Sequence, residues 1–159
     1  MKRYIIHCSD SEWGNASEIT KWHCFPKEKI MQGKKSYQGN GWNHIGYHYI
    51  ILNGWTSPGY FDAHFDGHLE SGRNPEIDGA HTKGQNDATG ICLIGRSGLF
   101  TDNQFLGLHK FFNRQRDIYG PIDIQQHSAY DLNKPHCAGL DLAEFKKVDH
   151  EGYSGTVYV

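Results

Sequence analysis

Several features that mark other classes of protein are missing from this sequence of 159 residues. No apolar run approaches the roughly 20 residues that a membrane-spanning helix needs, and the apolar stretch Tyr4–Ile6 is too short for the core of a signal peptide. The sequence has 16 lysines and arginines against 18 acidic residues, which leaves no basic excess to neutralise nucleic-acid phosphates. We therefore predict a protein synthesised in the cytoplasm without a signal peptide, with no membrane insertion and no nucleic-acid partner.

The sequence also lacks paired cysteine motifs and any sign of a domain boundary. Its four cysteines, Cys8, Cys24, Cys92 and Cys137, form no Cys-x-x-Cys pair, and disulfides are disfavoured in a reducing compartment. There is no internal repeat, low-complexity tract or linker. We predict a single domain over residues 1–159, which is long enough to bury a core without metal or disulfide staples.

Strand-like and helix-like segments alternate along the chain. Alternating or continuous apolar patterns predict strands over residues 3–9, 46–54, 68–73, 88–95 and 122–128. Helical patterns cover residues 16–25, 101–120 and 140–148. The remaining long segments are typical of an exposed loop at 26–43 and of a hairpin or ordered insertion at 55–67. This order predicts an α/β fold of the mixed α+β kind, with a central mixed β-sheet flanked by helices.

Histidine is abundant, with 11 residues, and three chemistry-bearing side chains are candidates for a metal site. Alternation in the first strand puts His7 on the face opposite Cys8, which we predict to be a core residue. His127 stands where a strand passes into a loop, and Cys137 follows on that loop. Zinc sites that do chemistry typically use three protein ligands and leave a fourth position open. From the residues alone, Cys137 is a candidate disulfide half, redox thiol, core residue or metal ligand.

Four ordered blocks give the sequence a family resemblance. They are IIHCSDS, WNHIGYHYII, GAHTKGQNDATGICLIG and, near the end, His127 followed by HCAG. In this order they resemble the zinc-dependent type 2 N-acetylmuramoyl-L-alanine amidase family, which includes the amidase-type phage lysozymes and the peptidoglycan recognition proteins. The resemblance runs from about residue 3 to residue 145 and is most specific over residues 79–95. Residues 26–41 and 55–67 look like insertions relative to the compact phage members.

The resemblance implies a role for each matching position. The ligands of one Zn²⁺ per chain, in a surface groove, would be His7, His127 and Cys137. Tyr47 matches the tyrosine that faces the zinc-bound water, and strand alternation places it on the same face as Tyr49. His81 and Asn86 match positions that line the groove for the glycan and the stem peptide.

One position departs from the family pattern. Where the phage members carry a lysine two residues before the cysteine ligand, this chain has Pro135. Lys134 and His136 flank that proline. We prefer Lys134 as the catalytic cation that replaces the family lysine, and we keep His136 as the alternative.

The resemblance implies zinc-dependent hydrolysis of the amide bond between N-acetylmuramic acid and L-alanine in bacterial peptidoglycan. Such an enzyme is an endolysin or autolysin with peptidoglycan as its partner, and we expect a monomer. Without a signal peptide, it would reach a thin, Gram-negative-type wall through a separate membrane pore. Two alternatives stay open: a non-catalytic peptidoglycan-binding module of the same fold, and a structural zinc protein in which His136 is the fourth ligand.

Overall fold

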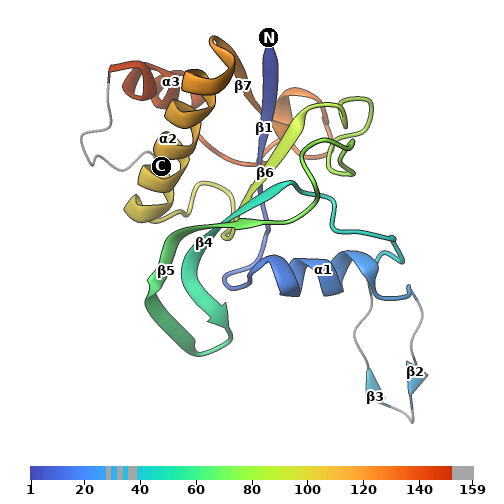
Figure 1. The fold of residues 1–159 in the computed structure, drawn as a ribbon. Helices are drawn as coiled ribbons and strands as arrows, with labels where there is room; N and C mark the ends of the chain where they lie inside the picture. Colours follow the sequence, from blue (N-terminus) through green and yellow to red (C-terminus); the bar gives the residue numbers. More distant parts are fainter. Residues whose placement is uncertain (28–29, 32–33, 36–38, 152–159) are drawn as a thin grey trace.

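A mixed five-stranded β-sheet forms the centre of the molecule (Figure 1). The computed structural model describes residues 1–27, 30–31, 34–35 and 39–151. The strands of the sheet, in spatial order, are β5 (Tyr60–Ser71), β4 (Tyr49–Ser57), β6 (Thr89–Leu93), β1 (Lys2–Cys8) and β7 (Ile122–Gln126). Strand β1 runs parallel to β6 and β7, β4 runs parallel to β6, and β5 pairs antiparallel with β4. The predicted central mixed sheet is confirmed.

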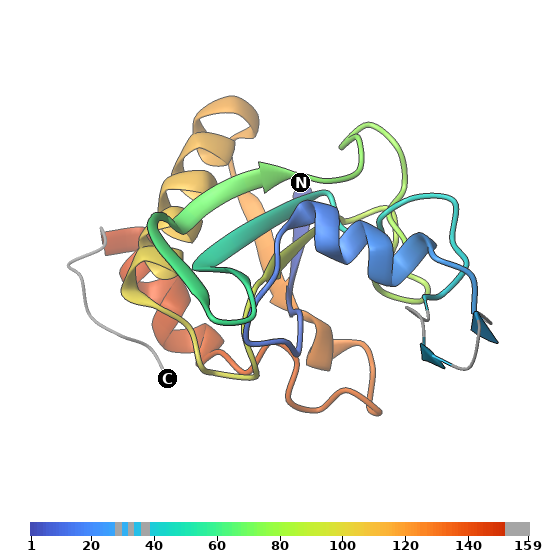
Figure 2. The same ribbon diagram turned by 90° about the horizontal axis from the view of Figure 1, so that it is seen from below.

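Helices cover both faces of this sheet. The α-helices in the described residues are α1 (Ala16–Cys24), α2 (Asp102–Tyr119) and α3 (Leu142–Glu151). Figures 1 and 2 show α2 and α3 together on one face and α1 on the other. The predicted single domain with flanking helices is therefore confirmed. Within the described part of the chain, no helix combines the length and the apolar character that crossing a lipid bilayer requires.

Each face of the sheet has its own hydrophobic cluster. On the side of α2 and α3, Tyr4 of β1 belongs to a cluster with Phe112 of α2. On the side of α1, Ile50 of β4 belongs to a cluster with Ile19 of α1. Successive strand residues point to opposite faces, so a single strand such as β4 contributes side chains to both clusters. All of β6 is buried, as its continuous apolar pattern predicts for a central strand.

Helix α2 begins at the cap that the sequence predicts. The Thr101 hydroxyl accepts a hydrogen bond from the Gln104 backbone N–H, and the Gln104 side chain accepts one from the Thr101 N–H, both at 3.0 Å. The Gln104 amide also donates to the carbonyl oxygens of Ile51 and Ile94 at 3.0 and 2.8 Å. This buried side chain therefore anchors the start of α2 to the sheet, in addition to completing the capping box.

Strands β4 and β5 form a long hairpin at one edge of the sheet. Ser57 pairs with Tyr60 across a tight turn in which Gly59 adopts a φ of 74°. The hairpin predicted over residues 55–67 is confirmed, and the strand predicted over residues 68–73 is the far end of β5.

The start of β4 differs from the prediction. The regular strand begins at Tyr49, so the alternation does not extend back to Tyr47. Tyr49 packs against the cluster on the α2 side, whereas Tyr47 packs against the cluster on the α1 side. The prediction that these two tyrosines share a face is therefore wrong.

The segment predicted as an exposed loop at residues 26–43 contains a small antiparallel pair apart from the central sheet (Figure 1). Its strands are β2 (Ile30–Met31) and β3 (Lys34–Lys35). Residues 28–29, 32–33 and 36–38 of the predicted loop lie outside the described residues. The status of segments 26–41 and 55–67 as insertions relative to phage relatives stays a prediction.

Candidate metal centre and pocket

The ends of two adjacent parallel strands bring His7 and His127 together. The register pairs Ile6 of β1 with Gln126 of β7, so the two histidines follow at the same edge of the sheet. His127 opens the short 3-10 helix η1 (His127–Ala129), and the centroids of the two imidazole rings lie 4.5 Å apart. The carboxyl ends of parallel strands are where sheets of this kind commonly hold ligands.

Cys137 joins this pair from the loop between η1 and α3. The Ser128 backbone N–H donates to the Cys137 carbonyl at 2.6 Å, which ties the loop back to η1. One nitrogen of His7, one nitrogen of His127 and the Cys137 sulfur all lie within 4.8 Å of one another. The structure thus brings together the three side chains that the sequence predicts as ligands, and their binding of zinc stays a prediction.

The chemistry of this donor set fits a zinc ion. Two imidazole nitrogens and a thiolate are donors that zinc accepts in tetrahedral geometry, and three protein ligands leave a fourth position open. An imidazole must be neutral to bind a metal. Burial, together with the neighbouring His81 and His127, holds the pKa of His7 well below its usual value. Burial also lowers the pKa of His127, so both rings are in the form that a metal binds.

Cys8 lies directly beside Cys137. Its sulfur is 3.8 Å from the Cys137 sulfur, and its backbone N–H donates to that sulfur at 3.4 Å. Hydrogen bonding between the thiols lowers the pKa of Cys8 and raises the pKa of Cys137, so without a metal the first proton lost from the pair comes from Cys8. Cys8 packs against the core on the α2 side, as predicted, but it also lines the pocket described next. The sequence did not indicate this second contact.

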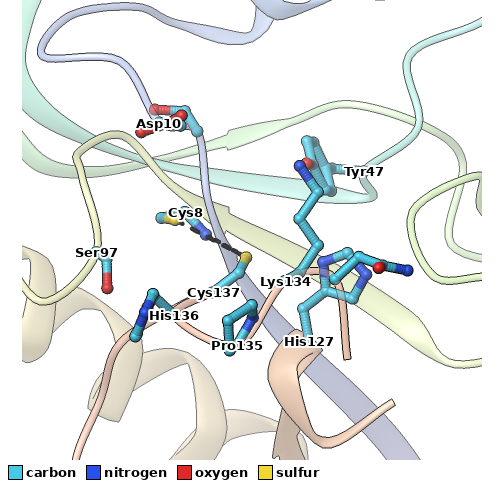
Figure 3. Close-up of a pocket in the computed structure, with 11 residues that line it drawn as sticks. Cys8, Asp10, Tyr47, Ser97, His127, Lys134, Pro135, His136 and Cys137 are labelled. Carbon is cyan, nitrogen blue, oxygen red and sulfur yellow. Dashed lines mark hydrogen bonds between the residues drawn. The ribbon is translucent and has the colours of Figure 1, made fainter. Parts of the chain in front are cut away.

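A surface pocket opens beside the three candidate ligands (Figure 3). It is lined by Cys8, Ser9, Asp10, Tyr47, Ser97, His127, Asn133, Lys134, Pro135, His136 and Cys137. The Tyr47 ring centroid lies 5.0 Å from that of His7. Burial, with nearby cysteines, raises the pKa of Tyr47 well above its usual value, so its phenol is a neutral hydrogen-bond donor at physiological pH. The candidate metal centre thus borders a surface pocket, with Tyr47 in its lining.

Lys134 and His136 point in different directions within this pocket. In Figure 3 the Lys134 side chain extends toward Tyr47, whereas His136 lies on the side of Ser97. The charge of Lys134 also contributes to the lowered pKa of His127. Both observations favour Lys134 over His136 as the cation nearest the candidate metal centre.

His81 and Asn86 lie behind the ligands instead of in the lining of the pocket. The His81 Nδ1 atom is 3.0 Å from the His7 Nε2 atom, and burial lowers the pKa of His81 to about 4. The Asn86 side-chain oxygen accepts hydrogen bonds from the backbone N–H groups of His81 and Thr82, each at 2.9 Å. Their predicted contact with substrate is untested, but both have clear partners within the protein.

Two further residues contact the candidate ligands, and no pattern in the sequence predicts either contact. The Thr82 hydroxyl is 3.3 Å from His7 Nε2, and an Asp131 carboxylate oxygen is 3.8 Å from His127 Nε2. Asp131 follows His127 by four residues, a spacing that would suggest contact on a helix. The segment after η1 is not helical, so this contact depends on the fold of the loop.

Comparison with known proteins identifies relatives of the chain. No protein-family model matches the chain. The chain is 32% identical over 149 residues to the endolysin of Klebsiella phage KP32, which covers 87% of this chain and 80% of that protein.

Two solved structures share the fold at lower sequence identity. The N-acetylmuramoyl-L-alanine amidase LysC from Clostridium intestinale URNW has a TM-score of 0.69 and 20% identity, covering 92% of this chain and 83% of that chain. Bumblebee PGRP-SA, a peptidoglycan recognition protein, has a TM-score of 0.65 and 20% identity, covering 98% of this chain and 83% of that chain. The fold is therefore common to an amidase and a recognition protein. The identity with the KP32 protein and the share of it that is covered establish the relationship: the chain belongs to the phage endolysin family.

Proposed function

We propose that this chain is a zinc-dependent N-acetylmuramoyl-L-alanine amidase that cuts the bond between N-acetylmuramic acid and L-alanine in bacterial peptidoglycan. The observation that carries the proposal is the convergence of His7, His127 and Cys137 beside an open pocket. Membership of the endolysin family supports peptidoglycan as the substrate. The shared fold of the LysC amidase supports the amide as the bond that is cut.

The three proposed ligands are two neutral imidazoles and one thiolate. When bound, zinc supplies a Lewis acid that polarises the amide carbonyl and acidifies water. His7 and His127 offer neutral nitrogen donors, because burial lowers the pKa of each. Cys137 binds as the thiolate, and the N–H of Cys8 at 3.4 Å from its sulfur helps to stabilise that negative charge.

Tyr47 and Lys134 act on the substrate side of the pocket. The neutral Tyr47 phenol orients the attacking water or the scissile carbonyl by donating a hydrogen bond. The Lys134 ammonium compensates the negative charge that develops on the amide oxygen in the transition state. One donor of this kind is typically worth about 3–4 kcal/mol in transition-state stabilisation. Water is the nucleophile, so no covalent attack by a cysteine is required.

A non-catalytic peptidoglycan-binding module is the second candidate function. Pro135 at the position of the family lysine favours it, because the catalytic cation is then displaced along the loop. The orientation of Lys134 into the pocket opposes it (Figure 3). A structural zinc site is less well supported, because the group of potential ligands found among the described residues does not include His136.

We also propose where the protein acts. It works on the cell wall as a monomer, after release from the cytoplasm through a pore formed by a separate protein. Family membership supports action on the wall.

Mass spectrometry of purified peptidoglycan after incubation with the zinc-loaded protein tests the proposal. We expect new L-alanine amino termini on the stem peptides and uncut glycan strands. His7→Ala should form no product, whereas His64→Ala, whose side chain is 95% exposed, should cut normally and serves as the matched control. Cleavage at another bond would contradict the amidase assignment. Retained binding without any product would favour the recognition module.

A further inference from the structure

One imidazole nitrogen of His7 is occupied inside the protein. The Nε2 atom lies 3.0 Å from Nδ1 of His81 and 3.3 Å from the Thr82 hydroxyl. His7 is only 1% exposed, so water does not compete for these contacts. The other nitrogen, Nδ1, is the atom left for a metal.

The contacts of His81 determine which atom donates in the bond to His7. The His81 Nε2 atom lies 2.9 Å from the Ala88 carbonyl oxygen. A carbonyl only accepts, so Nε2 of His81 carries the hydrogen of the neutral ring and Nδ1 presents a lone pair. The Thr82 hydroxyl lies 3.0 Å from the same Nδ1 atom and 3.3 Å from His7 Nε2, so it can accept from His7 and donate to His81. With acceptors on this side, His7 donates from its own Nε2, which leaves the lone pair of the His7 ring on Nδ1.

The His81 ring is held in a slot that only glycines can form. A Cβ atom built on Gly79 or on Gly90 would lie 2.4 Å from the His81 Cδ2 atom. The two hydrogen bonds that Asn86 accepts from the backbone of His81 and Thr82 fix the start of the ring's segment. Ring rotation is therefore restricted on both sides, and the bond to Ala88 selects one orientation.

We propose that His81 is a positioning residue that sets the tautomer of His7: it accepts the His7 Nε2–H hydrogen bond and so directs the Nδ1 lone pair of His7 to the metal. This inference rests on the proposed metal centre and gives His81 a role other than substrate contact. A partner of this kind orients a ligating imidazole and raises its affinity for the metal. The chain places that partner on the loop before β6, far from His7 in sequence.

Two substitutions at the same position separate the proposed role from simple packing. His81→Asn places an amide oxygen near the position of Nδ1 and keeps an acceptor for His7. His81→Gln places an amide nitrogen near the position of Nε2, so it keeps the donor to Ala88 but loses the acceptor. Both leave a polar amide in the slot, and the melting temperature of each metal-free variant reports any packing defect apart from the effect on zinc.

The test measures zinc affinity by competition with a chromophoric chelator, alongside the melting temperature of each metal-free variant. We expect His81→Gln to bind zinc about 10–100-fold more weakly than the wild type, and His81→Asn to retain most of the affinity. Nitrogen-15 NMR of the wild-type protein should show the proton of His7 on Nε2, both with and without zinc.

Three outcomes would overturn the inference. Equal zinc affinity in His81→Gln and the wild type, or equal losses in both variants, would contradict it while leaving the proposed function intact. A His7 proton on Nδ1 would contradict it without any variant having to fold. A wild-type protein that binds no zinc would contradict the proposed function itself, and the inference with it.

Discussion

His7 reaches the candidate metal centre from inside the sheet, whereas His127 reaches it from η1 at the end of β7 and Cys137 from the loop that follows η1. His7 is 1% exposed and contacts His81 and Thr82 through hydrogen-bonding distances. The loop side is held by local backbone hydrogen bonds of its own, such as the one from the Cys137 N–H to the Lys134 carbonyl at 3.1 Å. We therefore propose different tasks for the two sides: the buried side sets the geometry of the candidate ligands, and the loop side brings the charge of Lys134 to the substrate.

Loss of a loop ligand should have the largest effect. We expect Cys137→Ala to abolish zinc binding and peptidoglycan cleavage, because two imidazoles alone do not form a complete catalytic zinc site. The metal content of the purified variant and its rate on purified cell walls measure this. Cys24→Ala, at the end of α1 and outside the pocket lining, is the control and should behave as the wild type. A Cys137→Ala variant that keeps stoichiometric zinc would exclude Cys137 as a ligand.

Loss of the loop cation should separate catalysis from metal binding. We expect Lys134→Ala to lower kcat about 10²–10³-fold, the usual effect of removing one oxyanion donor. Zinc affinity should be unchanged, because Lys134 is not among the candidate ligands. The neighbouring His136→Ala is the matched comparison in the same assay. A larger loss in His136→Ala than in Lys134→Ala would reverse the assignment.

A methyl group added behind His7 should disturb the buried side. In Gly90→Ala the new Cβ would meet His81 Cδ2 at 2.4 Å, and overpacking of this kind typically costs about 1–3 kcal/mol in unfolding free energy. Displacement of the His81 ring should also weaken zinc binding. Urea unfolding and chelator competition measure the two effects.

Gly84→Ala is the control for this change. Its Cβ meets nothing within 4 Å, although Gly84 has a φ of 77°. It should therefore lose stability through backbone strain alone and keep its zinc affinity. Equal zinc affinities in the two glycine variants would show that the slot around His81 does not matter for the metal.

Mild acid should have a smaller effect, on the stability that His23 contributes next to Tyr47. Burial, with a contribution from Arg73, lowers the pKa of His23 to about 4, and its Nδ1 accepts a hydrogen bond from the Gly46 N–H at 2.9 Å. The unfolded chain binds this proton below about pH 6.5, before the folded chain does, so stability should fall as the pH drops from 6.5 toward 4. Partial exposure screens the effect, and we expect about 1 kcal/mol.

Urea unfolding of the metal-free protein at several pH values measures this slope. His23→Gln, which cannot gain the proton, should reduce the slope by the share of His23, while the other buried histidines keep the rest. His64→Gln on the exposed hairpin is the matched control. A slope that is the same in His23→Gln as in the wild type would mean that His23 is not the group responsible.

The two sides of the site also differ in how far the sequence predicts them. The buried side follows from strand patterns: alternation orients His7, and the continuous apolar run at 88–95 identifies β6 as a central strand. The candidate ligands were predicted because ordered sequence blocks match a family, and the structure brings them within 4.8 Å. The periodicity of the sequence thus predicts the strands that carry the site, and the family resemblance predicts which residues are the candidate ligands.

The remainder could not be predicted because it depends on loop geometry. The backbone before Tyr49 is irregular, so alternation placed Tyr47 on the wrong face. The contact between Cys8 and Cys137 joins residues distant in sequence, and no periodic pattern encodes it. The same holds for the contacts of both His81 ring nitrogens within the protein, whereas the contact of His81 with the substrate groove stays a prediction.

Zinc removal tests the central claim most directly. A sample stripped with a chelator and a matched sample with zinc restored would be incubated with the same purified peptidoglycan, and the release of L-alanine amino termini followed with time. The account predicts no release from the stripped protein and full recovery with one equivalent of Zn²⁺ per chain. Equal rates in the two samples would contradict it, because hydrolysis would then proceed without the ion that His7, His127 and Cys137 are proposed to hold.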